Sequence, residues 1–406
     1  MKKVLTLALC MAAVGTMSAQ KAVVDQASKL AGKNNQIGDA RNLIKQAMEN
    51  PETKNDVRTY YTAGKIEFEA LDNATKTKMI KPDDPIASDQ AMADEAINGY
   101  KYFVMALPLD SLPNEKGQIK PKYSKEMLGK ISGHANDYFT AGATYFNDKK
   151  YPEAYEAFYI YGNLPSTGYM GKAAEMMDPQ MIATSFFNAG LSAYSANMVD
   201  KSAEAFRKAR LNGYDQKESY IYEIACWQNI AQNDSTRAAE AQKNIMEVAM
   251  AGNERFGMEE PVFLNNMINT MVMDKRFDEA IAEIEKLISA NPDNGDLYGL
   301  RGFVYDRMNE DGKSEADYRK AAELSTSSFE TLKNSAKKIF RVGTEKWNEI
   351  DPTAADSEAA RQNIKKNYFE ASKAIVEKAA TMNPTDPDLQ NIMESIQYNL
   401  DTYFNN

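Results

Sequence analysis

The sequence is poor in the residues that catalytic and metal sites most often use. Its 406 residues include one histidine, two cysteines and two tryptophans. A catalytic histidine needs a nucleophile and an orienting acid, and a metal-binding histidine needs companion ligands. His134 is the only histidine in the sequence. We therefore predict no catalytic residue, no cofactor and no metal site, and we expect His134 to lie at a helix start with a solvent or backbone partner.

Cysteine is also too scarce for an internal disulfide. Cys10 lies in an N-terminal apolar stretch, so Cys226 is the one cysteine in the rest of the chain. It belongs to the run YEIACWQNI, whose apolar residues suit one face of a helix. We expect a buried, inert thiol, and we expect stability to come from packing rather than from cross-links.

The first residues have the pattern of a secretory signal peptide. Lys2 and Lys3 precede a short apolar run, and small residues lead to a cleavage site after Ala19. We expect residues 1–19 to be removed and the protein to be exported to the periplasm or the cell envelope. Lipidation of Cys10 is not expected, because Leu9 stands where lipoprotein signals have a small residue. No later run of 18 apolar residues predicts a transmembrane span.

The charge balance disfavours two classes of partner. With 48 basic and 58 acidic residues, the formal net charge is −10. Binding to nucleic acid phosphates needs clustered Lys and Arg, so the chain as a whole is unsuited to it, and attraction to anionic membranes is opposed for the same reason. The acidic run KPDDP at 81–85 lacks the ligand spacing of a calcium loop, and we interpret it as a solvated linker.

The rest of the chain has helical periodicity and internal repeats. From Gln20 onward apolar residues recur three or four positions apart, and no convincing alternating strand is present. A repeat of 34 residues is clearest over 261–294 and 295–328. In the second of these, the repeat positions are occupied by Tyr298, Gly302, Tyr305, Ser314, Tyr318 and Ala321. The best match lies earlier, at Tyr138, Ala141, Gly142, Tyr145, Ala154 and Phe158.

These offsets resemble the tetratricopeptide repeat, a helix–turn–helix unit of 34 residues. The resemblance extends over about residues 25–404, although Trp is absent from its usual slot and the unit around 220–250 matches weakly. It implies an all-α, right-handed superhelical solenoid of antiparallel helix pairs, with a capping helix at about 386–404. We expect an N-terminal array over 20–252 and a C-terminal array over 253–406. Loops are expected to interrupt the pattern at 74–89, 107–125 and 348–358.

Small residues recur at one position of the repeat. Gly64, Gly142, Gly190 and Gly302 fall in the same first-helix slot. A glycine inside a helix costs about 1 kcal/mol relative to alanine, so its recurrence calls for a packing reason. We predict that each glycine lets the second helix of the same repeat approach the first. A phosphate-binding loop is not supported at Ala141–Ala143, because the phosphate-loop pattern and a preceding strand are both missing.

In the tetratricopeptide family the first helices line a concave surface that takes a protein or peptide segment. The outward positions lie one and eight residues after the large residue of the first helix. In the N-terminal half these positions are all aromatic: Tyr61, Phe68, Phe139, Phe146, Phe187 and Tyr194. They either line a partner-binding groove or pack between repeats as core. In the 295–328 repeat the same positions carry Gly299 and Asp306. The family's carboxylate clamp is not matched, since Lys65 alone takes a plausible clamp position.

The resemblance therefore implies a non-enzymatic protein-interaction scaffold of the cell envelope, with a protein or peptide partner. One alternative is a glycan-binding protein on the same helical repeats, for which Trp227 and Trp347 would have to be exposed on one face. A second alternative is an enzyme with an unrecognised carboxylate site.

Overall fold

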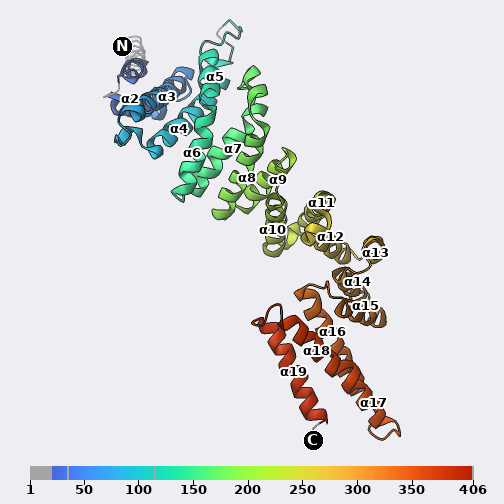
Figure 1. Cartoon of the computed structure of the whole chain (residues 1–406). Coiled ribbons are helices and arrows are strands. Elements are labelled where there is room, and N and C mark those ends of the chain that lie inside the picture. The colour runs from blue at the N-terminus through green and yellow to red at the C-terminus, as the bar shows by residue number, and fades with distance from the viewer. Residues whose placement is uncertain (1–20, 34–35, 114–115, 405–406) are drawn as a thin grey trace, which may run out of the picture. The chain divides into compact units, whose positions relative to one another are not determined.

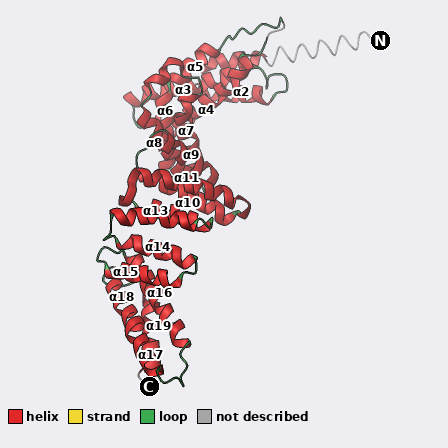
Figure 2. Cartoon of the chain, turned by 90° about the vertical axis from the view of Figure 1, so that its right-hand side faces the viewer, coloured by secondary structure: helices red, strands yellow, loops and turns green. Residues whose placement is uncertain are grey.

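The computed structural model describes residues 21–33, 36–113 and 116–404, and over these residues the fold is all-α, as predicted. Helices follow one another with short connections (Figure 2). The only pairing of extended backbone in the described residues is one isolated bridge between Pro113 and Ile119. The predicted signal peptide at 1–19, together with Cys10, lies outside the described residues. No helix among the described residues is long and apolar enough to cross a membrane.

The chain divides into two compact units, one up to Val248 and one from Ala249 onward. The first unit begins with a helical stretch at 21–31. Its further helices, coloured from blue to green in Figure 1, are α2 (Ile37–Glu49), α3 (Val57–Ile80), α4 (Asp89–Asp110), α5 (Ser124–Gly133), α6 (Ala135–Asn147), α7 (Tyr151–Asn163), α8 (Pro179–Ser195), α9 (Val199–Leu211) and α10 (Lys217–Asn233). Helix α11 (Ala238–Phe256) runs through the division. The array boundary expected at residues 252 and 253 stays a prediction.

The second unit continues the alternation of helices. It contains α12 (Pro261–Met273), α13 (Phe277–Ala290), α14 (Gly295–Arg307), α15 (Asp311–Glu323), α16 (Phe329–Asn348), α17 (Ser357–Ile364), a π-helical turn η7 (Lys365–Glu370), α18 (Ala371–Ala380) and α19 (Pro387–Phe404). Each of the helices α12 to α16 contacts the next, and α12 also contacts α14, as α14 contacts α16. First helices of successive repeats therefore lie side by side. Helix α19 packs on α18 and α16, where the capping helix was expected.

A shared turn ends the first helix of four repeats. The residue two positions after the helix has a positive φ of 57 to 60° at Lys149, Asn197, Lys275 and Asn309. The next amide donates back across the turn: Lys150 N–H to Tyr145 at 2.8 Å, and Glu310 N–H to Tyr305 at 2.9 Å. This is the hydrogen bond of a Schellman C-cap, which usually uses glycine at the left-handed position. This turn could not be predicted from the sequence, because lysine or asparagine occupies the left-handed position.

The recurring glycines are the points of closest helix approach, as predicted. A Cβ built on Gly142 would lie 2.7 Å from ring carbons of Phe158, and one built on Gly190 would lie 2.6 Å from the Phe206 ring. Gly64 meets Phe103, and Gly302 meets Tyr318, in the same way. In each case the ring belongs to the second helix of the same pair. The ring fills the volume that a side chain on the first helix would need.

Two of the expected loops are shorter than predicted. Helix α3 continues to Ile80, so the first half of the segment 74–89 is helical, with Ala74 buried against the core. Helix α4 continues to Asp110 with Pro108 in its last turn, and α5 begins at Ser124. Pro108 has no N–H to donate to the carbonyl four residues earlier, and α4 ends two residues after it. The third break, between α16 and α17, spans 349–356.

A buried ionic cluster joins α2, α3 and α4. Arg41 Nη2 bonds Glu67 Oε2 at 2.5 Å and Glu95 Oε1 at 3.1 Å. Glu67 and Glu95 are 6% and 7% exposed, and Glu95 Oε2 is buried without a hydrogen-bond partner in the described residues. Burial raises the pKa of Glu95 to about 7, against the lowering effect of Arg41. The second carboxylate is therefore only partly compensated by the single guanidinium.

Substituting Gly142, one of the recurring first-helix glycines, tests the packing of the helix pairs. Gly142→Val should lower the free energy of unfolding by about 1–3 kcal/mol or more, because the new side chain overlaps Phe158. Gly312→Val is the control. Gly312 lies in the first turn of α15, with open space at its Cβ. Urea unfolding followed by helical circular dichroism checks both variants, and equal losses would contradict the packing account.

The carboxyl of Glu95 should make stability depend on pH. Its folded pKa lies above the ordinary value near 4.3, so its contribution is complete below about pH 4 and is lost as pH rises through about 7. Glu95→Gln should therefore flatten the stability profile between pH 5 and 8, by about 1–3 kcal/mol. Urea midpoints at several pH values measure this, with Glu175→Gln, at an exposed position, as control. An unchanged profile would show that Arg41 compensates both acids.

Candidate ligand groove

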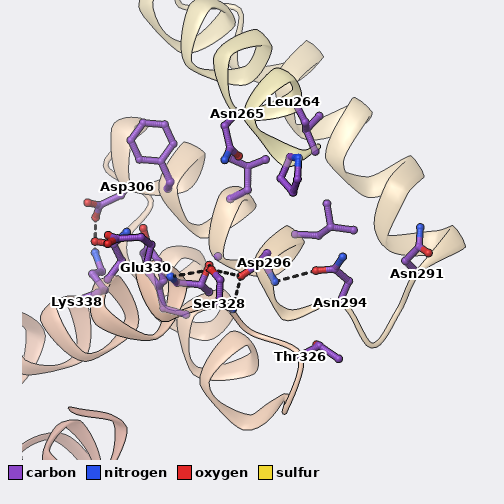
Figure 3. Close-up of a pocket in the computed structure, with 18 of the residues that line it drawn as sticks. Leu264, Asn265, Asn291, Asn294, Asp296, Asp306, Thr326, Ser328, Glu330 and Lys338 are labelled. Carbon is purple, nitrogen blue, oxygen red and sulfur yellow. Dashed lines mark hydrogen bonds and ion pairs between the residues drawn. The ribbon is translucent and has the colours of Figure 1, made fainter. Parts of the chain in front are cut away.

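A groove of about 1210 Å³ lies in the second unit, along the first helices of three successive repeats. Its walls are formed by α12, α14 and α16 and its end by the loop before α14 (Figure 3). The direct contacts of α14 with α12 and with α16 place the three helices in one row. This volume exceeds the few hundred to about 1000 Å³ of an ordinary small-molecule pocket.

The polar lining of the groove is largely amide. Asn265 and Asn269 lie one turn apart on α12, and Asn334 lies on α16 with Lys337 on the next turn. All four are exposed, and within the described residues their side chains have no hydrogen-bond or ion-pair partner. An asparagine amide offers two donors and one acceptor oxygen. The lining therefore presents unused donors and acceptors on two facing helices.

An apolar strip accompanies these amides. Met258, Leu300 and Phe303 are half-buried, and Pro261 is exposed at the start of α12. Gly299, beside Leu300, lets α16 lie close to α14, since a Cβ there would be 2.6 Å from the Thr331 methyl group. The groove therefore offers apolar surface and hydrogen-bonding groups side by side.

Hydrogen bonds fix one end of the groove. Asn294 Oδ1 accepts from the Asp296 amide at 3.0 Å and so caps α14. Asp296 Oδ1 accepts from both the amide and the hydroxyl of Ser328, each at 2.8 Å (Figure 3). The Thr326 hydroxyl accepts from the Gly295 amide at 3.0 Å. Because these bonds join the starts of α14 and α16, they set the spacing of the two helices.

A buried lysine fixes the other end. Lys338 is 4% exposed, and its Nζ lies 2.6 Å from Asp306 Oδ1 and 2.6 Å from Asp311 Oδ1. Arg341 Nη2 also lies 2.8 Å from Asp306 Oδ1. Hydrogen bonding and charge from Lys338 lower the pKa of Asp311. We call Lys338, Asp306, Asp311 and Arg341 the lysine clasp. It ties the turn between α14 and α15 to α16.

The six aromatic residues predicted to line a groove all lie in the first unit. Phe68 is 1% exposed and packs on Phe103 and His134. Tyr61 is 9% exposed, and its ring stacks on Tyr123. These two rings belong to the core, which was the other interpretation of the pattern.

The other four predicted residues are less buried but have aromatic neighbours. Phe139 contacts Phe158 and Tyr161, and Phe146 contacts Tyr151. Phe187 stacks on Tyr214 at 4.3 Å, and Tyr194, near Tyr222, is 49% exposed. Partner binding by Phe139, Phe146, Phe187 and Tyr194 stays a prediction. Lys65, in the plausible clamp position, pairs with Glu69 at 3.6 Å.

The cysteine, the histidine and the two tryptophans of the described chain all pack against or bond to neighbouring residues. The Cys226 thiol is buried, as expected, and burial raises its pKa to about 11. His134 lies at the start of α6, as expected, and its ring contacts two acids, with Nδ1 2.7 Å from Asp137 Oδ2 and Nε2 3.5 Å from Asp72 Oδ1. Trp227 is half-buried with Arg237 over its ring, and half-buried Trp347 stacks on Tyr403 at 4.3 Å. Neither tryptophan offers the exposed platform that the glycan-binding alternative requires.

Two residues that the sequence analysis singled out belong to the groove, although no groove was predicted there. Gly299 and Asp306 occupy the outward first-helix positions, and both line the groove. They were set aside because they are not aromatic. The amides on α12 and α16 carry no motif of their own, and their spacing of one turn was the only signal available.

The sequence matches no family model and no curated protein. Among solved structures, the APC/C hetero-tetramer Cut9-Hcn1 is 11% identical with a TM-score of 0.32, and the match covers 88% of this chain and 58% of that one. Yeast Tom70 is 12% identical with a TM-score of 0.25, and the match covers 95% of this chain and 97% of that one. This chain thus spans little more than half the length of the first of these. The likeness concerns the fold alone.

The helix pairs, their repeat spacing and the row of first helices define the class of the protein. It is an all-α, tetratricopeptide-like repeat protein. In the second unit, the row of first helices forms an open groove.

Removing the buried charge tests the lysine clasp. Lys338→Met keeps most of the apolar stem but leaves Asp306 and Asp311 with Arg341 as their one remaining cation in the clasp. Both acids are partly exposed, so we expect a loss of about 1 kcal/mol in the free energy of unfolding at neutral pH. Because Lys338 lowers the pKa of Asp311, the loss should shrink as pH falls below about 4. Urea unfolding measures it, with exposed Lys313→Met as control, and a loss independent of pH would indicate a packing effect alone.

Proposed function

We propose that this protein is a non-enzymatic interaction scaffold that binds an extended segment of another protein in the groove of α12, α14 and α16. The observation that carries the proposal is the set of unpaired groups at Asn265, Asn269, Asn334 and Lys337, which come from two helices and face one groove. A single exposed asparagine is common on a protein surface. Several that face the same groove are unusual.

The groove suits a backbone better than a compact small molecule. An extended segment exposes N–H and C=O groups at regular intervals, and asparagine side chains can pair with both kinds of group. The apolar strip at Leu300 and Phe303 can take an apolar side chain of the same segment. The Asp296–Ser328 contact and the lysine clasp already hold the groove walls, so little ordering is needed on binding.

Three of the four acids that line the groove have side chains with structural partners. Asp306 belongs to the lysine clasp, Glu330 pairs with Lys333 at 3.0 Å, and Asp296 binds Ser328. This arrangement favours binding over carboxylate catalysis. We also propose that the protein acts outside the cytoplasm, in the periplasm or at the envelope, on the strength of the signal-peptide pattern at residues 1–19.

Selection of ligands from a displayed library of random peptides tests the groove directly. Peptides selected on the wild-type protein should lose about tenfold in affinity for Asn269→Ala/Asn334→Ala, because each lost hydrogen bond contributes about 0.5–1.5 kcal/mol. The matched control is Asn348→Ala/Asn391→Ala, at exposed positions outside the groove.

Two results would contradict the proposal. One is a selection that yields no peptide. The other is a set of peptides whose binding is unchanged in the groove variant. Tyr194→Ala is tested as a separate variant. If only this variant loses peptide binding, the binding site lies at the predicted aromatic residues of the first unit.

A further inference from the structure

A second feature lies in the first unit, in the connection between α4 and α5. Residues 116–125, KGQIKPKYSK, contain four lysines and no acid, in a chain whose net charge is −10. Lys116, Lys120, Lys122 and Lys125 are all exposed. We call these ten residues the basic loop. It is a local reversal of the charge of the whole chain.

The base of the basic loop is firmly held. The carboxylate of Asp110, at the end of α4, accepts hydrogen bonds from the amides of Lys122, Tyr123 and Ser124 at 2.7 to 3.0 Å. It also accepts from the Ser124 hydroxyl at 2.7 Å. Burial opposes ionisation of Asp110, yet these bonds lower its pKa.

Aromatic packing adds a second attachment. Tyr123 stacks on Tyr61 at 4.2 Å, and the Tyr61 hydroxyl donates to Glu126 at 2.7 Å. Tyr61 is a core residue of α3, so the C-terminal end of the basic loop is tied to the helix stack. The lysines are therefore presented from a fixed base rather than from a free linker.

Apolar side chains accompany the lysines. Leu112 and Ile119 are each 61% exposed. An antiparallel bridge joins Pro113 to Ile119, and Gly117 takes a positive φ of 71° between them. The bridge brings the exposed Ile119 next to the segment that carries Leu112. Two exposed apolar side chains thus project beside a row of cations.

We propose that the basic loop docks on the surface of an anionic lipid bilayer. Lysines attract anionic headgroups, and adjacent apolar side chains enter the interface between headgroups and acyl chains. The groove described above lies in the second unit and includes no residue of this loop. A protein partner needs a face of about 800 Å² on each side, whereas a projecting loop suits a flat, deformable surface. The inference is independent of the groove and of its ligand.

The net charge of the chain does not prevent this contact. Exposed charges farther away than a Debye length of about 8 Å are largely screened at physiological salt. A lipid surface at the loop therefore interacts chiefly with the four lysines and with the adjoining exposed Glu126, whose carboxylate accepts a hydrogen bond from Tyr61. Each lysine near an anionic surface contributes about fivefold to the partition coefficient.

Co-sedimentation of the full chain with lipid vesicles tests the proposal. The wild-type protein should bind vesicles of mixed phosphatidylcholine and phosphatidylglycerol, should bind phosphatidylcholine alone much less, and should be released by high salt. Lys120→Gln/Lys122→Gln/Lys125→Gln should lower the partition coefficient by on the order of a hundredfold. Leu112→Ser/Ile119→Ser should lower it on mixed vesicles while leaving its salt dependence unchanged.

Two matched controls come from elsewhere in the chain. Lys286→Gln/Lys313→Gln/Lys320→Gln removes three exposed lysines of the second unit, and Met79→Ser/Ile80→Ser removes two apolar residues that are 81% and 79% exposed. Both should bind like the wild type. Helical circular dichroism confirms that each variant is folded.

Three results would overturn the proposal. They are no binding of wild type to mixed vesicles, equal losses in the loop and control variants, and wild-type binding to heparin but not to vesicles. The last result would identify the loop as a site for a soluble polyanion. None of these outcomes depends on peptide binding in the groove, so the two proposals fail separately.

Discussion

The structure depends on the close approach of two helices at a residue without a side chain. In the pairs α6–α7 and α8–α9, an aromatic ring of the second helix occupies the space above a glycine of the first. The loss of helix propensity at each glycine is about 1 kcal/mol, and the burial of a phenylalanine ring is worth about 1.5–3 kcal/mol. The exchange is favourable only if the glycine and the ring face each other. This requirement fixes how the two helices are rotated about their axes.

That rotation also decides which side chains remain free. When the glycine face of a first helix is turned toward its partner helix, the positions one and eight residues after the large residue of that first helix are not on the face that meets the partner. In the second unit these residues are Gly299 and Asp306, and they lie in the groove. The lysine clasp and the Asp296–Ser328 contact then hold neighbouring repeats at a fixed spacing. The groove is thus a result of packing that is set inside each pair.

Much of the fold could be predicted from the sequence, because spacing alone specifies the helix pairs. Pro261 and Gly295 start α12 and α14 one repeat length apart, as the periodicity indicated. The Schellman turns at Lys149 and Asn309 could not be foreseen, since the left-handed position carries no glycine. Nor could the ends of α3 and α4. Lysine and threonine at the end of α3 are as compatible with a last helical turn as with a loop, and Pro108 in the last turn of α4 is a residue that usually marks a break.

The candidate site residues were harder to find. Aromatic residues at the outward first-helix positions were interpreted as the sign of a binding surface. Phe68 shows why this sign is ambiguous, since large rings are what a helix stack needs to fill its interior. The amides of Asn265 and Asn269 are recognisable only when the structure shows that no side chain or backbone group among the described residues pairs with them. The lysines of the basic loop were visible as a linker, but their firm attachment through Asp110 was not.

The pairing of glycine with ring also bears on how the chain acquires its structure. Gly142 and Phe158, like Gly190 and Phe206, stand one helix apart in sequence. The contacts that define each pair therefore close only a short loop of chain, and the entropy lost on forming them is small. Proteins rich in such local contacts fold quickly. A helix pair can therefore begin to form from its own residues, and the neighbouring repeats then supply the core that stabilises it.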